Sequence, residues 1–285
     1  MQKDLREALA PYLKENPVPG QKPFYSVSQA GIADRALSTG QGGLTVMQEC
    51  LAQDIWPERF RPNRGVFAAA DQAKLLACRA AVIGAGGLGG LVILLLARFG
   101  LGGLTVCDGD VFEESNLNRQ FLSSQDRLGR NKASCAAEEV ARVNPYTRVE
   151  VFDFFAGPDN FAAILKGAQV ALDCLDNMTA RYALEEAAAA SGIPYVHGAV
   201  AGLEGFVMTV APGEPGLRGL YGPRPAEKKE SAEAVLGVPT LIPAAVATLQ
   251  ANEAVKLLLG RRGLGRGRLL HLDLAGPGLE ILSLG

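Results

Sequence analysis

The chain has 285 residues, of which 48% are hydrophobic and 20% charged, a balance typical of globular domains. Its formal net charge of −2 excludes a protein that binds nucleic acid or membrane surfaces through bulk positive charge. The most apolar run, residues 91–97, is too short to span a bilayer, and the first residues carry no apolar signal-peptide core. We therefore expect a cytoplasmic protein with neither nucleic acid nor a membrane as partner.

The cysteines and histidines do not suggest a metal site. The five cysteines are scattered and form no Cys-x-x-Cys pair, so neither a disulfide framework nor a zinc knuckle is expected. They are Cys50, Cys78, Cys107, Cys135 and Cys174. The two histidines, His197 and His271, are too isolated in the sequence to form a ligand set, and we interpret both as structural.

Residues 1–58 predict a small helical segment. Three leucines spaced four residues apart predict an amphipathic helix over residues 4–16. Two shorter helices are predicted over residues 27–36 and 45–53, and a basic stretch follows at residues 59–65.

From about residue 78 the sequence alternates short apolar strands with helices. Repeated βα units of this length predict an α/β fold with a doubly wound, mostly parallel Rossmann-like sheet and helices on both faces. The parallel strands are predicted at residues 80–84, 103–107, 148–154, 169–174 and 195–201. The helices are predicted at residues 88–99, 132–143, 160–166, 179–191 and 243–259.

The C-terminal part of the second domain predicts a different arrangement. Residues 205–211, 269–274 and 279–284 predict antiparallel strands at one end of the sheet. Residues 212–237 are rich in proline, glycine and charge, which predicts an exposed crossover loop. We place the second domain at residues 59–285.

The most informative stretch begins with a glycine-rich turn, GAGGLG, at residues 84–89. Glycines between a strand and a helix permit a tight turn and a close approach of the backbone to phosphate at the helix N-terminus. Asp108 ends the next predicted strand, where dinucleotide-binding folds place an acceptor for ribose hydroxyls. Up to this point the spacing fits a dehydrogenase and an ATP-using enzyme equally well.

The residues that follow favour ATP. Arg119 is a planar donor suited to phosphate oxygens, and Asn116, Asn118 and Gln120 add neutral hydrogen-bonding groups beside it. Lys132 opens a predicted helix, where its ammonium and the helix dipole both attract phosphate. Because hydride transfer has no use for these groups, their convergence favours activation of a carboxylate by ATP.

Asp176 follows the predicted buried strand that contains Cys174. Because strand carboxyl ends face the ligand crevice of a doubly wound sheet, Asp176 is a candidate ligand for a Mg²⁺ ion that bridges phosphates. Capping the N-terminus of the next helix is an alternative role, and the two roles are compatible. Cys174 is interpreted as packed rather than nucleophilic.

Together these motifs resemble the ThiF/MoeB/HesA family, relatives of ubiquitin-activating enzymes that adenylate the C-terminal glycine of a ubiquitin-like protein. The matching stretches lie between residues 59 and 260 and follow the family's order and spacing. They are GAGGLGG (84–90), CDGD (107–110), SNLNRQ (115–120), GRNKA (129–133), DCLDN (173–177) and LQANEAVKLL (249–258).

The resemblance implies an ATP-binding adenylation domain over residues 59–285, in which Asp108 contacts the ribose and Asp176 holds magnesium. The residues implied to bind ATP are Gly84, Gly86, Gly87, Gly89, Asp108, Asp110, Asn116, Asn118 and Gln120. Those implied in catalysis are Arg119, Lys132, Asp176 and Arg64.

The family also supplies one arginine from the partner subunit of a homodimer to each ATP site. Arg59, Arg61 and Arg64 all compete for this role, because Pro62 changes the usual spacing of the basic segment. The helical segment 1–58 either braces the dimer or binds the carrier, and bracing is favoured because helix signals alone usually mean packing.

The chain departs from the family at two places. Many members bind a structural zinc through two Cys-x-x-Cys pairs, but residues 215–220 read PGLRGL and the C-terminal tail has no cysteine, so no zinc site is expected. Members that handle sulfur or a thioester often carry a cysteine in the crossover loop. The nearest counterpart here is Ser231, which cannot supply a thiolate.

The sequence therefore predicts a homodimeric adenylyltransferase that depends on ATP and Mg²⁺. Its partner would be a ubiquitin-like sulfur-carrier protein with a C-terminal Gly-Gly, and a separate sulfur donor or transferase would act downstream. Two alternatives stay open: a non-catalytic ATP-binding scaffold of the same family, and an NAD(P)-dependent oxidoreductase.

Overall fold

The computed structural model describes residues 5–20, 22–225, 232–276 and 278–284. The chain divides into two compact units, Met1–Ala77 and Cys78–Gly285. Within the described residues, no helix has both the length and the apolar character needed to cross a membrane.

The N-terminal unit combines short helices with a three-stranded sheet of order β1-β2-β3. Strand β1 pairs antiparallel with β2, and β2 pairs parallel with β3. The elements are α1 (Leu5–Leu9), a 3₁₀ turn (Ala10–Tyr12), β1 (Leu13–Asn16), β2 (Phe24–Val27), α2 (Gln29–Thr39), α3 (Gly43–Ala52), β3 (Ile55–Pro57), a second 3₁₀ helix (Glu58–Asn63) and α4 (Ala69–Ala77). Trp56, Phe60 and Met47 are fully buried and form part of its core.

The structure corrects the prediction for the start of the chain. The predicted helix over residues 4–16 is wrong beyond α1, because Pro11 lies in the 3₁₀ turn, where it cannot continue an α-helix, and β1 follows. The sequence does not predict the three strands, which have only three or four residues each. The other two predicted helices are confirmed as α2 and α3. Helix α4 packs against α3 and so groups with this unit.

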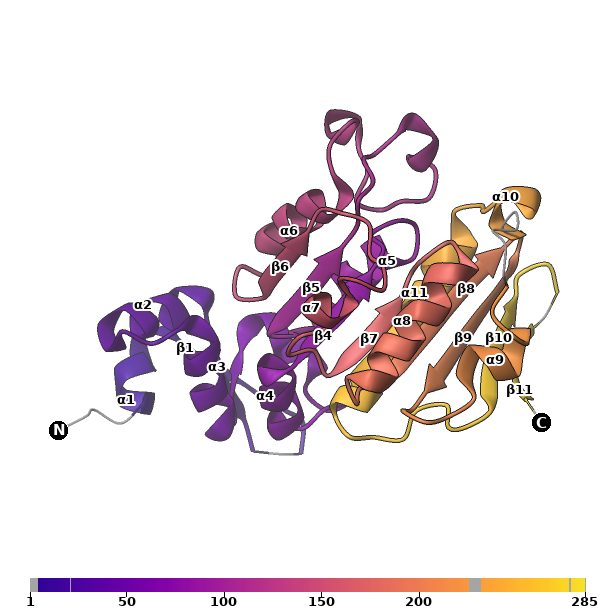
Figure 1. Ribbon diagram of the computed structural model, residues 1–285. Helices are drawn as coiled ribbons and strands as arrows, with labels where there is room; N and C mark the ends of the chain where they lie inside the picture. Colours follow the sequence, from indigo (N-terminus) through magenta and orange to yellow (C-terminus); the bar gives the residue numbers. More distant parts are fainter. Residues whose placement is uncertain (1–4, 21, 226–231, 277, 285) are drawn as a thin grey trace. The chain divides into compact units, whose positions relative to one another are not determined.

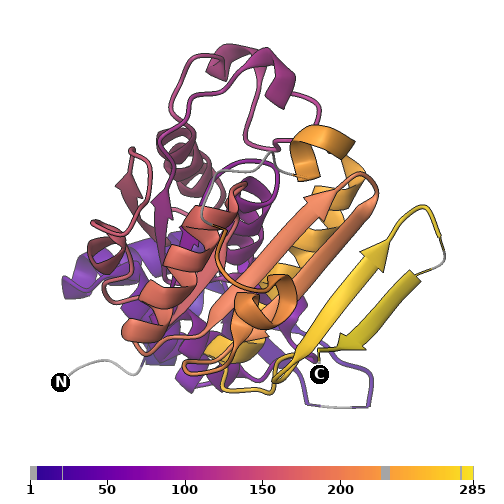
Figure 2. The same cartoon turned by 45° about the vertical axis from the view of Figure 1, so that its right-hand side comes forward.

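The second unit is built on an eight-stranded sheet of order β11-β10-β9-β8-β7-β4-β5-β6. Its strands are β4 (Arg79–Ile83), β5 (Gly103–Cys107), β6 (Arg148–Phe152), β7 (Val170–Asp173), β8 (Tyr195–Ala201), β9 (Glu204–Val210), β10 (Arg268–Asp273) and β11 (Gly278–Ser283). Strands β6, β5, β4, β7 and β8 run parallel, and β9, β10 and β11 complete the sheet in antiparallel pairings. Figures 1 and 2 show the β10–β11 hairpin at the edge of the sheet. The predicted α/β class, parallel core and antiparallel C-terminal strands are confirmed.

Helices cover both faces of this sheet. They are α5 (Gly89–Phe99), α6 (Lys132–Val143), α7 (Phe161–Ile164), α8 (Met178–Ala190), α9 (Gly216–Tyr221), α10 (Ala232–Leu236) and α11 (Leu241–Leu258). Helix α5 packs against both α6 and α11 in one layer, whereas α7 and α8 pack together in the other. Figure 1 shows α8 in front of the sheet and α11 behind it. Helices α9 and α10 lie in the segment predicted as an exposed loop, residues 212–237, which we call the crossover segment.

The strand order determines where a ligand can bind. Strand β4 lies between β5 and β7, and every residue of β5 and β7 is buried, as expected for parallel strands covered on both faces. The connections from β4 and its neighbours leave toward opposite faces, so the carboxyl ends of these strands border a crevice. The glycine turn at residues 84–89 follows β4 and therefore lies at this crevice.

The antiparallel strands carry a histidine between two glutamates. His271 on β10 lies 3.1 Å from Glu280 on β11 (Nδ1 to Oε1) and 3.3 Å from Glu204 on β9 (Nε2 to Oε2). Its ring stacks on Phe206 with 4.9 Å between centroids. The hydrogen bond to Glu280, assisted by the one to Glu204, raises the pKa of His271.

Because the folded-state pKa of His271 is raised, its charged form stabilises the fold at pH values below its unfolded-state pKa. This stabilisation is lost as the pH rises through the folded-state pKa. We predict that His271→Gln lowers the free energy of unfolding by about 0.2–1 kcal/mol at about pH 5.5, and by less at about pH 9. Urea unfolding of both proteins at the two pH values tests this. A difference that does not change with pH would contradict it.

Candidate functional site

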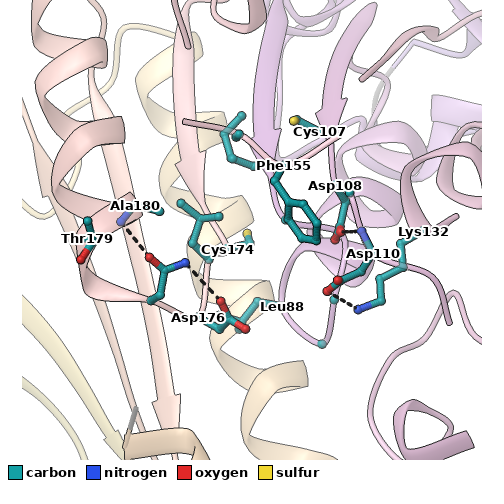
Figure 3. Close-up of a pocket in the computed structure, with 18 of the residues that line it drawn as sticks. Leu88, Cys107, Asp108, Asp110, Lys132, Phe155, Cys174, Asp176, Thr179 and Ala180 are labelled. Atoms are coloured by element: carbon teal, nitrogen blue, oxygen red, sulfur yellow. Dashed lines mark hydrogen bonds and ion pairs between the residues drawn. The ribbon is translucent and has the colours of Figure 1, made fainter. Parts of the chain in front are cut away.

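A cavity of about 1150 Å³ opens at the carboxyl ends of the parallel strands. Nine of the residues predicted for the site line it: Gly84, Gly86, Gly87, Asp108, Asp110, Arg119, Gln120, Lys132 and Asp176. The lining does not include Gly89, Asn116 or Asn118, and Arg64 belongs to the N-terminal unit. Figure 3 shows Asp108, Asp110 and Lys132 together on one side and Asp176 on the other.

The glycines of the turn fall into two groups. Gly84 has a left-handed φ of +94°, and a Cβ there would overlap the carbonyl oxygen of Cys174. A Cβ on Gly89 would overlap the carbonyl oxygen of Gly84, so this glycine lets α5 pack tightly onto the turn. Gly86 and Gly87 have nothing closer than 3.7 Å and 3.6 Å to an added Cβ, and both face the cavity. The first pair shapes the turn, and the second keeps its surface open to a ligand.

Asp108 connects the end of β5 to the glycine turn. Its Oδ2 accepts a hydrogen bond from the Ala85 amide at 2.6 Å, and its Oδ1 accepts one from the Asp110 amide at 2.8 Å. Burial raises the pKa of Asp108, against the lowering effect of these two amides. The carboxyl group keeps acceptor capacity toward the cavity, as a contact with ribose hydroxyls requires.

Lys132 is a buried ammonium at the first turn of α6. Its Nζ lies 3.1 Å from Asp110 Oδ2. Asn131 caps the helix by accepting a hydrogen bond from the Ser134 amide, and its own amide donates to the Asp108 carbonyl at 2.9 Å. The cap thereby joins α6 to β5, and the lysine and the helix N-terminus both direct positive charge at the cavity.

The SNLNRQ stretch divides into residues that reach the cavity and residues that build the loop. Arg119 Nη1 donates to the Ser115 carbonyl at 3.0 Å and to Asn118 Oδ1 at 2.9 Å, so Asn118 orients the guanidinium. Asn116 forms a capping box with Glu113. Gln120 lines the cavity, and its buried Oε1 has no hydrogen-bond partner within the described part of the chain. A buried acceptor without a partner fits a ligand donor.

Asp176 is exposed and lines the cavity just beyond β7. The alternative role of capping the next helix is wrong for this residue, because Asn177 accepts the hydrogen bond from the Ala180 amide at 2.8 Å (Figure 3). No group of three or more His, Cys, Asp or Glu among the described residues could hold a metal ion. A single carboxylate fits Mg²⁺, which is commonly held by one or two carboxylates together with substrate phosphates.

The sequence does not predict several lining residues. Phe155 follows β6, and its place after a parallel strand is a signal that could have identified it. Arg224 comes from the crossover segment, whose composition gives no such signal. Cys174 also lines the cavity, and β7 ends one residue before it. Burial raises the pKa of the Cys174 thiol well above its usual value.

Hydrogen bonds from α8 hold the start of the crossover segment. Glu185 accepts from the Leu217 amide at 2.9 Å, and the Tyr182 hydroxyl donates to the carbonyls of Leu217 (3.2 Å) and Gly222 (2.7 Å). These contacts lie where the resemblance would place a Cys-x-x-Cys pair. Ser231 lies outside the described residues.

The three competing arginines are each bound within the N-terminal unit. Arg59 donates to Gln29 at 2.7 Å, and Arg61 pairs with Glu58 at 2.9 Å. The Arg64 guanidinium lies 4.0 Å from the centroid of the Phe24 ring, and one of its nitrogens lies 3.8 Å from Asp54.

The ThiF family model matches residues 60–283 of the chain. The chain belongs to the ThiF family. The SAMP-activating enzyme E1 of Haloferax volcanii is 40% identical over 202 residues, which cover 71% of this chain and 75% of that protein. The probable adenylyltransferase/sulfurtransferase MoeZ of Mycobacterium tuberculosis is 37% identical over 207 residues, 71% of this chain but only 53% of MoeZ.

Solved structures share the fold of this ThiF-family chain. PaaA superimposes with a TM-score of 0.66 at 23% identity, covering 90% of this chain and 80% of PaaA. The tRNA N6-threonylcarbamoyladenosine dehydratase TcdA of E. coli superimposes with a TM-score of 0.60 at 26% identity, covering 72% of this chain and 95% of TcdA.

The two groups of glycines predict opposite effects of one added methyl group. We expect Gly86→Ala to leave the thermal unfolding midpoint unchanged and to weaken ATP binding by about tenfold, because its Cβ would occupy the surface offered to phosphate. Gly89→Ala should instead destabilise the fold by about 1–3 kcal/mol or more, since the added carbon overlaps backbone. Calorimetric titration with ATP and thermal unfolding measure both. Unchanged ATP affinity in Gly86→Ala would exclude the turn as the phosphate cradle.

Proposed function

We propose that this ThiF-family adenylyltransferase uses ATP to activate the C-terminal carboxylate of a ubiquitin-like sulfur-carrier protein, releasing pyrophosphate. The observation that carries the proposal is the convergence of Arg119, Lys132 and Asp176 on one cavity that also contains the open glycines of the turn. The relatives named above, a SAMP-activating enzyme E1 and a probable adenylyltransferase/sulfurtransferase, support this reaction class.

In the proposed reaction, a carboxylate oxygen of the carrier attacks the α-phosphorus of ATP. The new oxygen–phosphorus bond forms as the bond to the bridging oxygen of the β-phosphate breaks, and that oxygen leaves with its electron pair in pyrophosphate. The products are an acyl-adenylate and pyrophosphate. No general base is needed, because a C-terminal carboxylate is already ionised at neutral pH.

The protein's contribution is then to position the reactants and neutralise charge. Arg119, oriented by Asn118, and Lys132, held by Asp110, supply fixed positive groups for the phosphates. Asp108 would accept from the ribose hydroxyls, and Gln120 would add a neutral hydrogen bond. Asp176 would hold Mg²⁺, which neutralises phosphate charge when bound.

We propose that the group that accepts the activated acyl group lies on another protein. Burial raises the pKa of Cys50 and of Cys107 to about 12, and that of Cys174 well above its usual value. A thiol with such a pKa is not a thiolate at neutral pH, so none of these three cysteines is an effective nucleophile. A separate sulfur donor or transferase would therefore accept the acyl group.

Exchange of labelled pyrophosphate into ATP tests the reaction, with candidate Gly-Gly carriers supplied as substrate. We predict that Arg119→Ala lowers the exchange rate by about 10²–10³-fold, as expected when a fixed donor to developing charge is removed. Asn118→Ala should cause a smaller loss, because this residue acts through Arg119.

Arg142→Ala is the matched control, because Arg142 lies on α6 with a side chain that is 68% exposed, outside the cavity lining. Near-normal exchange by Arg119→Ala would remove Arg119 from the mechanism. Tight ATP binding without exchange for any carrier would favour a scaffold over an enzyme.

We further propose a homodimer in which Arg64 of each subunit reaches the ATP of the other, with the N-terminal segment bracing the dimer. The resemblance supports the arrangement in trans. Arg64, like Arg59 and Arg61, is bound within the N-terminal unit, and its side chain keeps 26% exposure, so we take Arg64 as the first candidate of the three.

Mixing two inactive variants tests this arrangement. If Arg64 acts in trans, an equal mixture of Arg119→Ala and Arg64→Ala subunits should recover about one quarter of wild-type exchange, because half of the dimers contain one intact site of two. No recovery would place Arg64 in its own subunit's site. Full activity of Arg64→Ala alone would exclude Arg64 and direct the same test to Arg59 and Arg61.

A further inference from the structure

A fully buried carboxylate next to the site has no role in the reaction described above. Asp173, the last residue of β7, is 0% exposed. Burial acts to raise the pKa of Asp173, but the hydrogen bond from His197 and the charge of Arg181 outweigh it and lower this pKa. The group is therefore an ionised carboxylate inside the protein, which is costly unless its partners are fixed.

One oxygen of Asp173 holds the loop that carries Asp176. Its Oδ1 accepts a hydrogen bond from the Leu175 amide at 3.0 Å. The Arg181 guanidinium donates to the Leu175 carbonyl at 2.6 Å and 3.1 Å, and it also faces Asp173 Oδ2 at 3.8 Å. Both backbone groups of the residue preceding Asp176 are thus held by this buried ion pair.

The other oxygen of Asp173 faces the crossover segment through a histidine. His197 on β8, itself 0% exposed, places Nδ1 2.7 Å from Asp173 Oδ2, and its Nε2 lies 3.0 Å from the Tyr221 hydroxyl. Because a carboxylate only accepts hydrogen bonds, Nδ1 carries the proton, and in the neutral ring Nε2 accepts from Tyr221. Tyr221 ends α9, and Arg224, three residues further on, lines the cavity.

We propose that Asp173 and His197 are positioning residues that fix the Asp176 loop and the start of the crossover segment relative to each other beside the cavity. An effect of these residues on the Mg²⁺ dependence of catalysis rests on the proposed function. Their effect on the structure of the two segments does not. Loss of the Tyr221 hydroxyl leaves Nε2 without this partner and lets the imidazole move. Movement of the ring weakens its bond to the same carboxylate that holds the Leu175 amide.

Hydrogen exchange on the full-length protein tests the structural part. We expect Tyr221→Phe to increase the exchange rate of the backbone amides at residues 174–177 several-fold. Tyr221 is 40% exposed and its ring meets His197 edge-on, so the phenylalanine keeps the packing and the fold.

Tyr182→Phe is the matched control, because its hydroxyl also anchors α9 but has no hydrogen bond to His197 or Asp173 among those of the described residues. This variant should increase hydrogen exchange in residues 216–222 and affect residues 174–177 less than Tyr221→Phe does, because the Tyr221 hydroxyl is kept. Unchanged exchange at 174–177 in Tyr221→Phe, or equal increases in both variants, would overturn the coupling.

The kinetic part is read from the Mg²⁺ concentration that gives half-maximal pyrophosphate exchange. Tyr221→Phe and His197→Asn should each raise it by about tenfold, the scale seen when a partner of a metal ligand is removed, and Tyr182→Phe should not. In His197→Asn the shorter side chain would place an amide near the position of Nδ1 and could not reach Tyr221. Both substitutions cut the same link, so the double variant should behave as His197→Asn does alone.

If the increases in the half-maximal Mg²⁺ concentration multiply in the double variant, the two residues do not act through one shared link. If the wild-type chain shows no pyrophosphate exchange with any carrier, the proposed function fails. Hydrogen exchange still decides whether the Asp176 loop and the start of the crossover segment are coupled.

Discussion

The close contact between the end of β4 and the N-terminus of α5 is the constraint on which the site depends. Gly89 packs against the Gly84 carbonyl, and Gly84 packs against the Cys174 carbonyl, with no room for a Cβ at either position. This contact brings the ends of β4 and β7 together and leaves the α5 amides directed at the space between them. The ribose, phosphate and metal contacts proposed above all take their positions from it.

Around that contact, a neighbouring group orients each charged side chain of the cavity before any ligand arrives. Asn118 orients Arg119, Asp110 pairs with Lys132, and the Ala85 amide holds Asp108. Oriented donors need little reorganisation when charge develops, which is where electrostatic catalysis gains most. Asn116 and Asn118 of the SNLNRQ stretch therefore shape the loop and orient Arg119, whereas the sequence presents them as ligand contacts equal to Arg119 and Gln120.

The sequence predicts the elements and site residues that local patterns determine, and it misses those that depend on distant neighbours. The parallel strands, α6 and the glycine turn are predicted because local signals agree there: short apolar runs alternate with helical stretches, and glycines stand at a strand end. The N-terminal strands are missed because they are too short to show a period. The capping role of Asn177 is local, but Asp176 and Asn177 are adjacent and both are cap-forming residue types, so the sequence leaves open which of them accepts from the Ala180 amide. The placement of Arg224 and the partners that surround the buried Asp173 depend on neighbours distant in sequence, and no local pattern encodes them.

The start of the crossover segment is held by hydrogen bonds in the place where the resemblance would put a zinc-binding Cys-x-x-Cys pair. A structural zinc contributes about 10–16 kcal/mol to the segment it holds, whereas a neutral hydrogen bond contributes about 0.5–1.5 kcal/mol. Here the start of the segment is held by Glu185, Tyr182 and Tyr221, and thus by a few kcal/mol in total. Because these hydrogen bonds are few, the link from Tyr221 through His197 to Asp173 is a substantial part of what ties the start of this segment to the loop that carries Asp176.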